Sequence, residues 1–165
     1  MQNNEDLMKK TLLVGRHGVG KTTLKQALHG EKIHYVKTQY MLYDDWLIDS
    51  PGEYAEQHGL NAALAVYSYE ADVVAMLIAA NEDYTLFPPN CASMLNRDVI
   101  GIVTKIDKAD PKRADAWLRL SGCKRIFWVD SHTGRGIPEL KEYLRKKPKE
   151  NETNEIKDTE KETTT

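Results

Sequence analysis

The stretch "GRHGVGKT", residues 15–22, sets three glycines, a lysine and a threonine at the spacing G-x-x-x-x-G-K-[ST]. Glycines let such a loop wrap closely around an anion, with backbone N–H groups pointing inward. A lysine at this position reaches the β- and γ-phosphates of a nucleotide, and a threonine hydroxyl here ligates Mg²⁺. The chemistry expected of the stretch is therefore the binding of a nucleotide's phosphates.

The predicted nucleotide contacts cover most of this phosphate loop and the residue after it. They are Gly15, Gly18, Val19, Gly20, Lys21, Thr22 and Thr23. Lys21 is also expected to act in catalysis, and Thr22 to hold the metal. Arg16 is a weaker candidate for an internal cation that stabilises a transferred phosphoryl group. His17 is expected to lie exposed at the shoulder of the loop, with contact to the γ-phosphate as the alternative.

A second stretch, "DSPG" at 49–52, follows an apolar run. Asp49 is placed to hold a metal-bound water, and the Gly52 N–H to meet a γ-phosphate. An ordinary turn explains Pro51 and Gly52 equally well. The metal role of Asp49 therefore depends on its being brought close to the phosphate loop.

Two later stretches could choose the base. In "TKID" at 104–107, Asp107 can accept paired hydrogen bonds from the N1–H and 2-amino group of guanine, while the stem of Lys105 covers the ring. Adenine has neither donor, so it would leave a desolvated carboxylate unpaired. The polar turn "SHTG" at 131–134 follows the last apolar run. It resembles a loop whose backbone N–H groups contact guanine O6, although alone it is an ordinary polar turn. The predicted base-side contacts are Thr104, Lys105, Asp107, Ser131, His132 and Thr133.

Together these stretches resemble, in order and spacing, the motif set of small GTPases. "GRHGVGKTTL", "KTQYMLYDDWLIDSPGEY", "GIVTKIDKAD" and "VDSHTGRGIPEL" are similar to the EutP/PduV family, small GTPase-like proteins of bacterial ethanolamine and propanediol utilisation. The resemblance covers about residues 10–145. It implies a P-loop NTPase fold, GTP or GDP with Mg²⁺ as cofactors, and guanine-nucleotide-dependent work linked to protein-shelled microcompartments. A shell or pathway protein is the implied partner.

The resemblance also assigns two residues around the predicted site. Thr38 is implied to close over Mg²⁺ and the γ-phosphate, against the alternative of a threonine at a strand edge. Glu53 stands where many GTPases have a glutamine that orients the attacking water. Because a carboxylate is repelled by a triphosphate, a solvated surface acid is the alternative, and slow hydrolysis is expected. The implied catalytic set is Lys21, Thr38, Gly52 and Glu53, and the implied metal set is Thr22, Thr38 and Asp49.

The function expected first is a Mg²⁺-dependent GTP-binding switch or assembly factor with slow hydrolysis. Two alternatives use the same phosphate cradle. One is a phosphotransferase that passes the γ-phosphoryl group to a small acceptor such as acetate. The other is a nucleotide-binding module that hydrolyses nothing.

The elements that must position these residues alternate along the chain. Apolar runs predict strands within 9–15, 46–52, 72–80, 98–107 and 123–130. Amphipathic stretches predict helices within 21–30, 60–67, 111–118 and 136–147, and a short helix is expected at 91–95. The interval from Lys21 to Asp49 is brief, so a truncated extra strand is expected there. The pattern predicts an α/β, three-layer fold, a mostly parallel sheet with helices on both faces.

Length and composition set the remaining expectations. The 165 residues are 41% hydrophobic, enough for one core. We expect a short N-terminal segment (1–9), a GTPase-like domain (10–145) and a charged, disordered tail (146–165). A net charge of −2 gives no overall field to attract nucleic acid or an anionic membrane. Two cysteines and no long apolar run point to a reducing cytoplasm without a membrane span. The sequence makes no prediction of oligomeric state.

Overall fold

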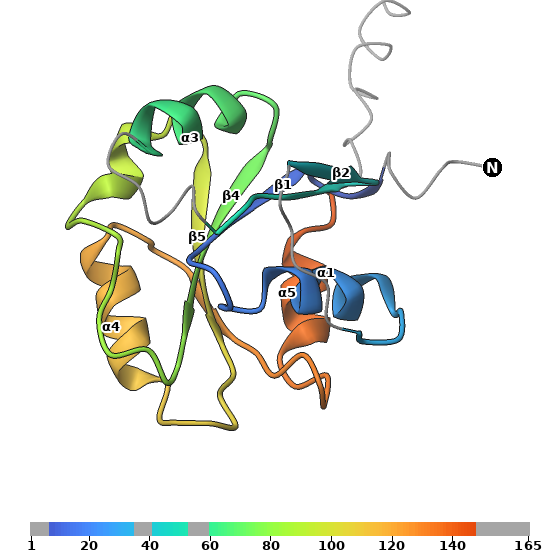
Figure 1. The fold of residues 1–165 in the computed structure, drawn as a ribbon. Helices are drawn as coiled ribbons and strands as arrows, with labels where there is room; N and C mark the ends of the chain where they lie inside the picture. The colour runs from blue at the N-terminus through green and yellow to red at the C-terminus, as the bar shows by residue number, and fades with distance from the viewer. Residues whose placement is uncertain (1–6, 35–40, 53–59, 148–165) are drawn as a thin grey trace, which may run out of the picture.

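Six strands form one sheet in the computed structural model, which describes residues 7–34, 41–52 and 60–147 (Figure 1). Their order across the sheet is β2-β3-β1-β4-β5-β6. The antiparallel pair of β2 and β3 is the exception among parallel neighbours. The strands are β1 (Thr11–Val14), β2 (Leu42–Asp44), β3 (Leu47–Asp49), β4 (Val73–Ala79), β5 (Asp98–Thr104) and β6 (Ile126–Trp128).

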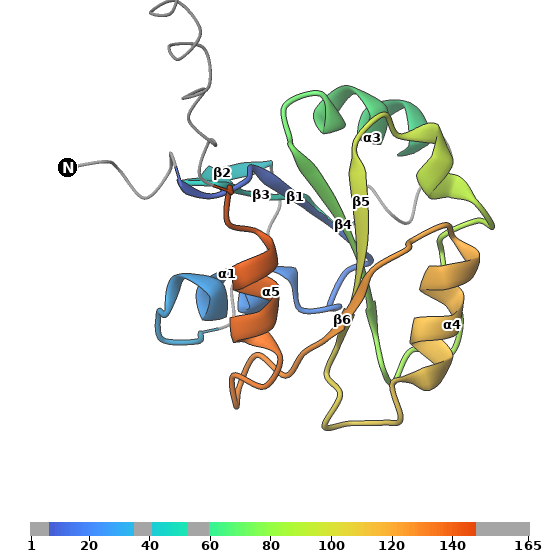
Figure 2. The same cartoon turned by 180° about the vertical axis from the view of Figure 1, so that it is seen from behind.

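Helices cover both faces of this sheet. α1 and α5 lie together on one face, and α3 and α4 lie on the other (Figures 1 and 2). The helices are α1 (Lys21–His29), α3 (Leu60–Ser68), α4 (Lys112–Leu120), α5 (Ile137–Tyr143) and the 3₁₀ helix η2 (Cys91–Met94). The predicted three-layer α/β fold is confirmed.

The central strands are apolar throughout because both of their faces are covered. Every residue of β1 and β4 is buried. Alternate side chains enter different cores, so Leu13 packs with α1 and α5 whereas Leu12 packs on the side of α3 and α4. Two cores on opposite faces of one sheet result, and they hold the strand ends in fixed positions.

The predicted boundaries of the elements are largely confirmed. Gly30 ends α1 in the left-handed conformation, with φ of 72°. The carboxylate of Asp110 accepts a hydrogen bond from the Lys112 N–H at 3.0 Å, next to Pro111 at the start of α4. The expected truncated strand is β2, which is three residues long. The weakly patterned stretch before β5 carries η2 at the expected place.

The two ends of the described chain meet at one side of the domain. Met8 is buried in the core and forms a bridge with Arg145, and the Lys9 N–H donates to the Leu144 carbonyl at 2.8 Å. Part of the predicted N-terminal segment therefore packs as part of the domain. Thr38, Glu53 and the predicted tail beyond 147 lie outside the described residues. In the part of the chain that the structure describes, no helix has the length and apolarity needed to cross a membrane.

Gly101 in β5 allows α4 to approach the sheet closely. A Cβ at this position would lie 3.0 Å from Leu118 Cδ1 and 3.2 Å from Ile126 Cγ1. We therefore predict that Gly101→Ala lowers the free energy of unfolding by about 1 to 3 kcal/mol, because an added methyl overpacks this contact. Urea denaturation measures the change. As a control, Ala116→Ser adds one atom on the exposed side of α4 and should shift the value by less than about 0.5 kcal/mol. Equal stability of Gly101→Ala and the unmodified protein would contradict the prediction.

Candidate nucleotide-binding site

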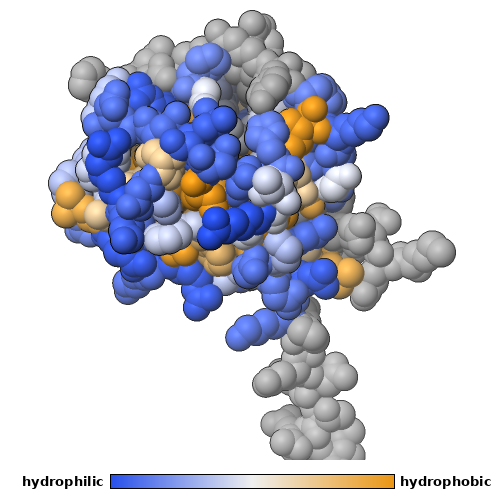
Figure 3. Space-filling view, turned by 90° about the horizontal axis from the view of Figure 1, so that it is seen from below, coloured by the Kyte–Doolittle hydropathy of each residue, from blue (hydrophilic) through white to orange (hydrophobic). Residues whose placement is uncertain are grey.

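A cavity of about 450 Å³ lies where the loops after β1, β3, β5 and β6 meet. In an open parallel sheet, ligands bind at this end, beyond the carboxyl ends of the strands. Residues on this side of the molecule are predominantly hydrophilic at the surface (Figure 3). The volume suits one small organic ligand.

Most of the predicted site residues within the described ranges line this cavity. The exceptions are Gly15, Asp49 and Thr133. His17 lines it too and is exposed, as expected. Further lining residues that the sequence did not single out are Ser50, Asn81, Lys108 and Asp130. The four motifs are therefore brought to one place by the fold.

The phosphate loop depends on its glycines for shape. Gly18 and Gly20 have φ of 78° and 103°, in the left-handed region that side chains disfavour. Gly15 is held tightly, since a Cβ there would lie 2.9 Å from the Leu77 carbonyl oxygen. α1 begins at Lys21, directly after Gly20, so the positive end of its dipole faces the loop. These features are typical of a turn that binds an anion.

The Lys21 ammonium is buried within this loop. Only 6% of the residue is exposed, and Nζ donates to the carbonyl oxygens of Gly15 at 2.7 Å and Arg16 at 3.1 Å. A buried cation requires such partners, because desolvation is costly. The contacts fix a positive charge at the wall of the cavity.

Thr22 and Asp49 are adjacent, although the sequence separates them. The Thr22 hydroxyl donates to Asp49 Oδ2 at 2.8 Å, and Asp49 is fully buried at the end of β3. A hydroxyl and a carboxylate are hard oxygen donors, the kind that Mg²⁺ takes together with several waters. This donor set fits a magnesium ion beside the phosphate loop.

The turn after β3 is pressed against the phosphate loop at Gly52. A Cβ on Gly52 would overlap the backbone of His17, so only glycine fits. Ser50, two residues earlier, is buried, and its hydroxyl donates to the Leu13 carbonyl at 2.6 Å. The Gly52 backbone thus lines the cavity at a fixed position.

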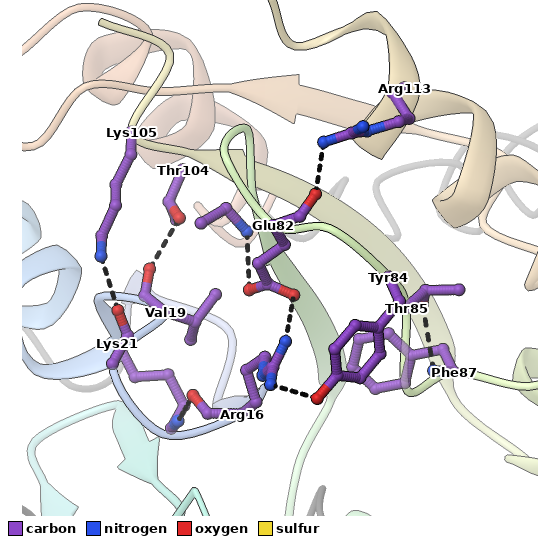
Figure 4. A network of polar contacts seen from close by, with 12 residues as sticks. Arg16, Val19, Lys21, Glu82, Tyr84, Thr85, Phe87, Thr104, Lys105 and Arg113 are labelled. Carbon is purple, nitrogen blue, oxygen red and sulfur yellow. Dashed lines mark hydrogen bonds and ion pairs between the residues drawn. The ribbon is translucent and has the colours of Figure 1, made fainter. Parts of the chain in front are cut away.

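The base-side loop is tied directly to the phosphate loop. The Thr104 hydroxyl donates to the Val19 carbonyl at 2.7 Å, and Lys105 Nζ donates to the Gly18 carbonyl at 2.6 Å (Figure 4). Lys105 itself has a positive φ of 55°, a strained conformation for a lysine. Thr104, predicted as a nucleotide contact, lines the cavity, and its hydroxyl also bonds the phosphate loop. The two ends of the cavity are therefore mechanically connected.

Asp107 and the "SHTG" turn line the same end of the cavity. The Asp107 side chain is 42% exposed, and its Oδ2 lies 3.6 Å from Lys108 Nζ. Ser131 and His132 come from the loop after β6. A carboxylate and a polar turn on one cavity wall form a surface suited to the edge of a purine.

Asp130 organises that turn, a role that sequence reasoning missed. Its carboxylate accepts hydrogen bonds from the His132 N–H at 3.0 Å and the Thr133 hydroxyl at 2.8 Å. Burial alone raises the pKa of Asp130, but these bonds outweigh it and hold the pKa below its ordinary value. Thr133 therefore supports the loop and does not line the cavity. An Asp directly before a polar turn is a recognisable signal.

Arg16 does not line the main cavity. Its guanidinium lies against Glu82 and Tyr84, on the outer side of the phosphate loop (Figure 4). The expectation of an internal cation at the phosphates is therefore wrong for this arrangement. The cause is a carboxylate in the weakly patterned stretch after β4, which the sequence pattern did not connect to the loop.

Two solved structures with the same fold are complexes with guanine nucleotides. Era from Aquifex aeolicus, bound to GDP and AlF₄⁻, has a TM-score of 0.59 at 21% identity, over 86% of this chain and 58% of that chain. Era in complex with MgGDPNP and part of 16S ribosomal RNA has a TM-score of 0.58 at 20% identity, with the same coverage. The chain thus spans just over half the length of Era. The likeness establishes a P-loop GTPase-like fold.

Relatives found by sequence are more similar to this chain than these solved structures are. The propanediol utilization protein PduV of Citrobacter freundii is 37% identical over 143 residues, which cover 85% of this chain and 95% of the relative. The protein named "Probable acetate kinase EutP" of Escherichia coli K12 is 29% identical over 153 residues, 90% of this chain and 96% of the relative. Residues 8–146 match the PduV-EutP family, described as "Ethanolamine utilisation - propanediol utilisation". The chain is therefore a member of the PduV-EutP family.

Proposed function

We propose that this protein binds GTP and GDP with Mg²⁺ and hydrolyses GTP slowly. It acts as a switch or assembly factor in ethanolamine or propanediol utilisation, in the cytoplasm and in association with a bacterial microcompartment. The observation that carries the proposal is that Lys21, Thr22 and Asp107 line one cavity and that Thr22 is hydrogen-bonded to the buried Asp49. A polyphosphate, a divalent cation and a guanine each find a matching group there.

In the proposed complex, Lys21 faces the β- and γ-phosphates. The N–H groups at the start of α1 add partial positive charge on the same side. Thr22 and Asp49 would hold Mg²⁺, which supplies charge neutralisation on the phosphate oxygens. Era has been captured with MgGDPNP on the same fold, which supports this choice of metal and nucleotide.

Asp107 is the proposed determinant of the base. Its carboxylate would accept from N1–H and the 2-amino group of guanine, and Lys105 would cover the ring. Ser131, His132 and the backbone at Thr133 complete the base end, held by Asp130. Adenine lacks both the N1–H and the 2-amino group, so GTP is the proposed nucleotide.

Slow hydrolysis is proposed because Arg16 is engaged elsewhere. A cation at the γ-phosphate contributes roughly 10³ to 10⁵ in rate in GTPases that have one. Here the Arg16 guanidinium contacts Tyr84 and faces Glu82. A partner protein is therefore proposed to supply the missing cation. Thr38, Gly52 and Glu53 are the proposed groups around the attacking water.

The family description supports the proposed pathway. A nucleotide-controlled protein of that pathway would present one surface with GTP and another with GDP, because the γ-phosphate orders nearby loops. A microcompartment shell or pathway protein is the proposed partner of the GTP-bound surface.

Acetate phosphorylation is the second candidate, and the printed name of the Escherichia coli relative motivates it. Such a reaction needs a place for a carboxylate next to the γ-phosphate. A hollow of about 320 Å³ adjoins the phosphate loop, and Glu82 and Asp83 line it together with Arg16 and Lys105. Its charges therefore balance, and it offers no excess positive charge to hold a carboxylate. Water is therefore the acceptor that we propose.

A turnover assay separates the candidates. The purified protein with Mg²⁺ is incubated with labelled GTP or ATP, with and without acetate, while inorganic phosphate and acetyl phosphate are followed. Slow phosphate release from GTP, unchanged by acetate, is the expected result. Acetyl phosphate that forms only with acetate would establish the phosphotransferase instead. Tight GTP binding without any product would indicate a nucleotide-binding module that hydrolyses nothing.

Removing the Lys21 ammonium should abolish recognition of the phosphates. We predict that Lys21→Ala weakens GTP binding by about 100-fold or more, because several charge-assisted hydrogen bonds are lost. Binding of GMP should change little. Fluorescence titration with a labelled analogue measures both. Lys25→Ala, on the same helix but outside the cavity lining, is the matched control and should bind GTP normally. Unaltered GTP affinity of Lys21→Ala would refute the phosphate assignment.

Removing the Asp107 carboxylate should abolish base selectivity. For Asp107→Ala, the ratio of GTP affinity to ATP affinity is expected to fall by at least about 100-fold, since the paired acceptor for guanine is lost. ATP binding provides the internal control and should remain weak and similar to that of the unmodified protein. Competition titrations give both constants. If Asp107→Ala kept the same ratio of GTP affinity to ATP affinity, another residue would have to recognise the base.

A further inference from the structure

Arg16, Glu82 and Tyr84 form a polar cluster on the outer side of the phosphate loop (Figure 4). We call Glu82 and Tyr84, the two residues that hold Arg16, the arginine clamp. They lie around the hollow that adjoins the main cavity, and Gly18 and Lys105 line both spaces. The cluster is thus next to the phosphate site without being part of its lining.

The clamp holds the Arg16 guanidinium by three interactions. Nη2 donates to the Tyr84 hydroxyl at 2.7 Å, and Nη1 lies 3.8 Å from Glu82 Oε2. The guanidinium carbon also lies 4.4 Å from the centre of the Tyr84 ring, a cation–π distance. The Glu82 side chain is only 11% exposed, so this ion pair is weakly screened. The Arg16 side chain is therefore held in one direction, and its positive charge is paired with Glu82.

Glu82 is itself fixed by the surrounding fold. Its Oε1 accepts the Ala79 N–H at 3.0 Å, at the end of β4. Its carbonyl oxygen accepts a hydrogen bond from Arg113 Nη2 of α4 at 2.6 Å. Burial raises the pKa of Glu82 above its ordinary value, although the Ala79 N–H and the cations Arg16, Lys105 and Lys21 act against this. The carboxylate of Glu82 is thus anchored to the end of β4, and its backbone to α4.

The backbone of Arg16 connects the clamp to the phosphate site. Its carbonyl oxygen accepts two hydrogen bonds, from Lys21 Nζ at 3.1 Å and from the Val19 N–H at 3.2 Å. The first bond helps to aim the ammonium, and the second closes the turn of the loop. A side chain that is fixed by Glu82 and Tyr84 therefore fixes the carbonyl on which Lys21 depends.

We propose that Glu82 and Tyr84 are positioning residues for the phosphates: by clamping Arg16, they hold its carbonyl where it supports Lys21 and the closed loop. This inference rests on the proposed binding of GTP in the cavity. It gives a role to the stretch after β4, which belongs to none of the four motifs.

Simple electrostatics makes the opposite prediction, which makes the proposal testable. Removing a negative charge near the phosphates should strengthen the binding of an anion. Loss of the clamp should instead weaken the binding of the phosphates, because Arg16 and the phosphate loop become less ordered. Glu82→Gln keeps an acceptor for the Ala79 N–H and removes the charge that faces Arg16. Asp83→Asn removes the same charge one residue away, from an exposed side chain of the same loop.

The experiment compares these two variants with the unmodified protein in two readouts. The first is the affinity for GTP, GDP and GMP. For Glu82→Gln we expect GTP to bind about fivefold more weakly, GDP to be affected less, and GMP to be unaffected, because Lys21 serves the terminal phosphates. Tyr84→Phe should show a smaller change in the same order. Asp83→Asn should bind GTP at least as tightly as the unmodified protein.

The second readout needs no nucleotide. Hydrogen exchange of the free protein should be faster at the Val19 amide in Glu82→Gln and unchanged in Asp83→Asn. Equal behaviour of the two variants in either readout would overturn the clamp, as would equal losses for GTP and GMP. If the unmodified protein bound no nucleotide, the proposed function would fail, while the exchange at Val19 would still decide whether the clamp orders the loop.

Discussion

The carbonyl oxygens of the phosphate loop are the groups on which the whole site depends. Lys21 bonds those of Gly15 and Arg16, Lys105 bonds that of Gly18, and Thr104 bonds that of Val19. Because side chains engage these acceptors, the edge of the loop that remains for a ligand is the one that carries N–H groups and the helix dipole. The polarity of the loop is therefore set by side chains from two places in the chain, the start of α1 and the carboxyl end of β5.

These same bonds couple the phosphate end to the base end. Thr104 ends β5 and Lys105 follows it, three and two residues before the Asp107 that is proposed to read guanine. A loop that shifts to admit a triphosphate must carry these contacts with it, and the Gly52 turn, pressed on His17, must shift too. The arrangement suits a protein whose state depends on the nucleotide it holds, as a switch requires.

Local patterns predicted the elements and the motifs because their causes are local. Apolar runs such as β4, and the spacing from Gly15 to Thr22, report burial and loop shape from neighbouring residues alone. The direction of Arg16 could not be predicted in this way, since it is decided by Glu82, a residue far along the chain in a stretch with no periodic signal. Likewise, the hydroxyls of Thr104 and Thr133 have partners in other parts of the fold or the turn, which reduces their availability to a ligand.

Calorimetric titration of the unmodified protein with GTP and with ATP, each with and without Mg²⁺, tests the central claim most directly. The account predicts that GTP with Mg²⁺ binds at one site and far more tightly than ATP, and that withdrawal of Mg²⁺ weakens GTP binding. Equal affinities for the two nucleotides, or GTP binding that is indifferent to Mg²⁺, would contradict the assigned roles of Asp107 or of the Thr22–Asp49 pair.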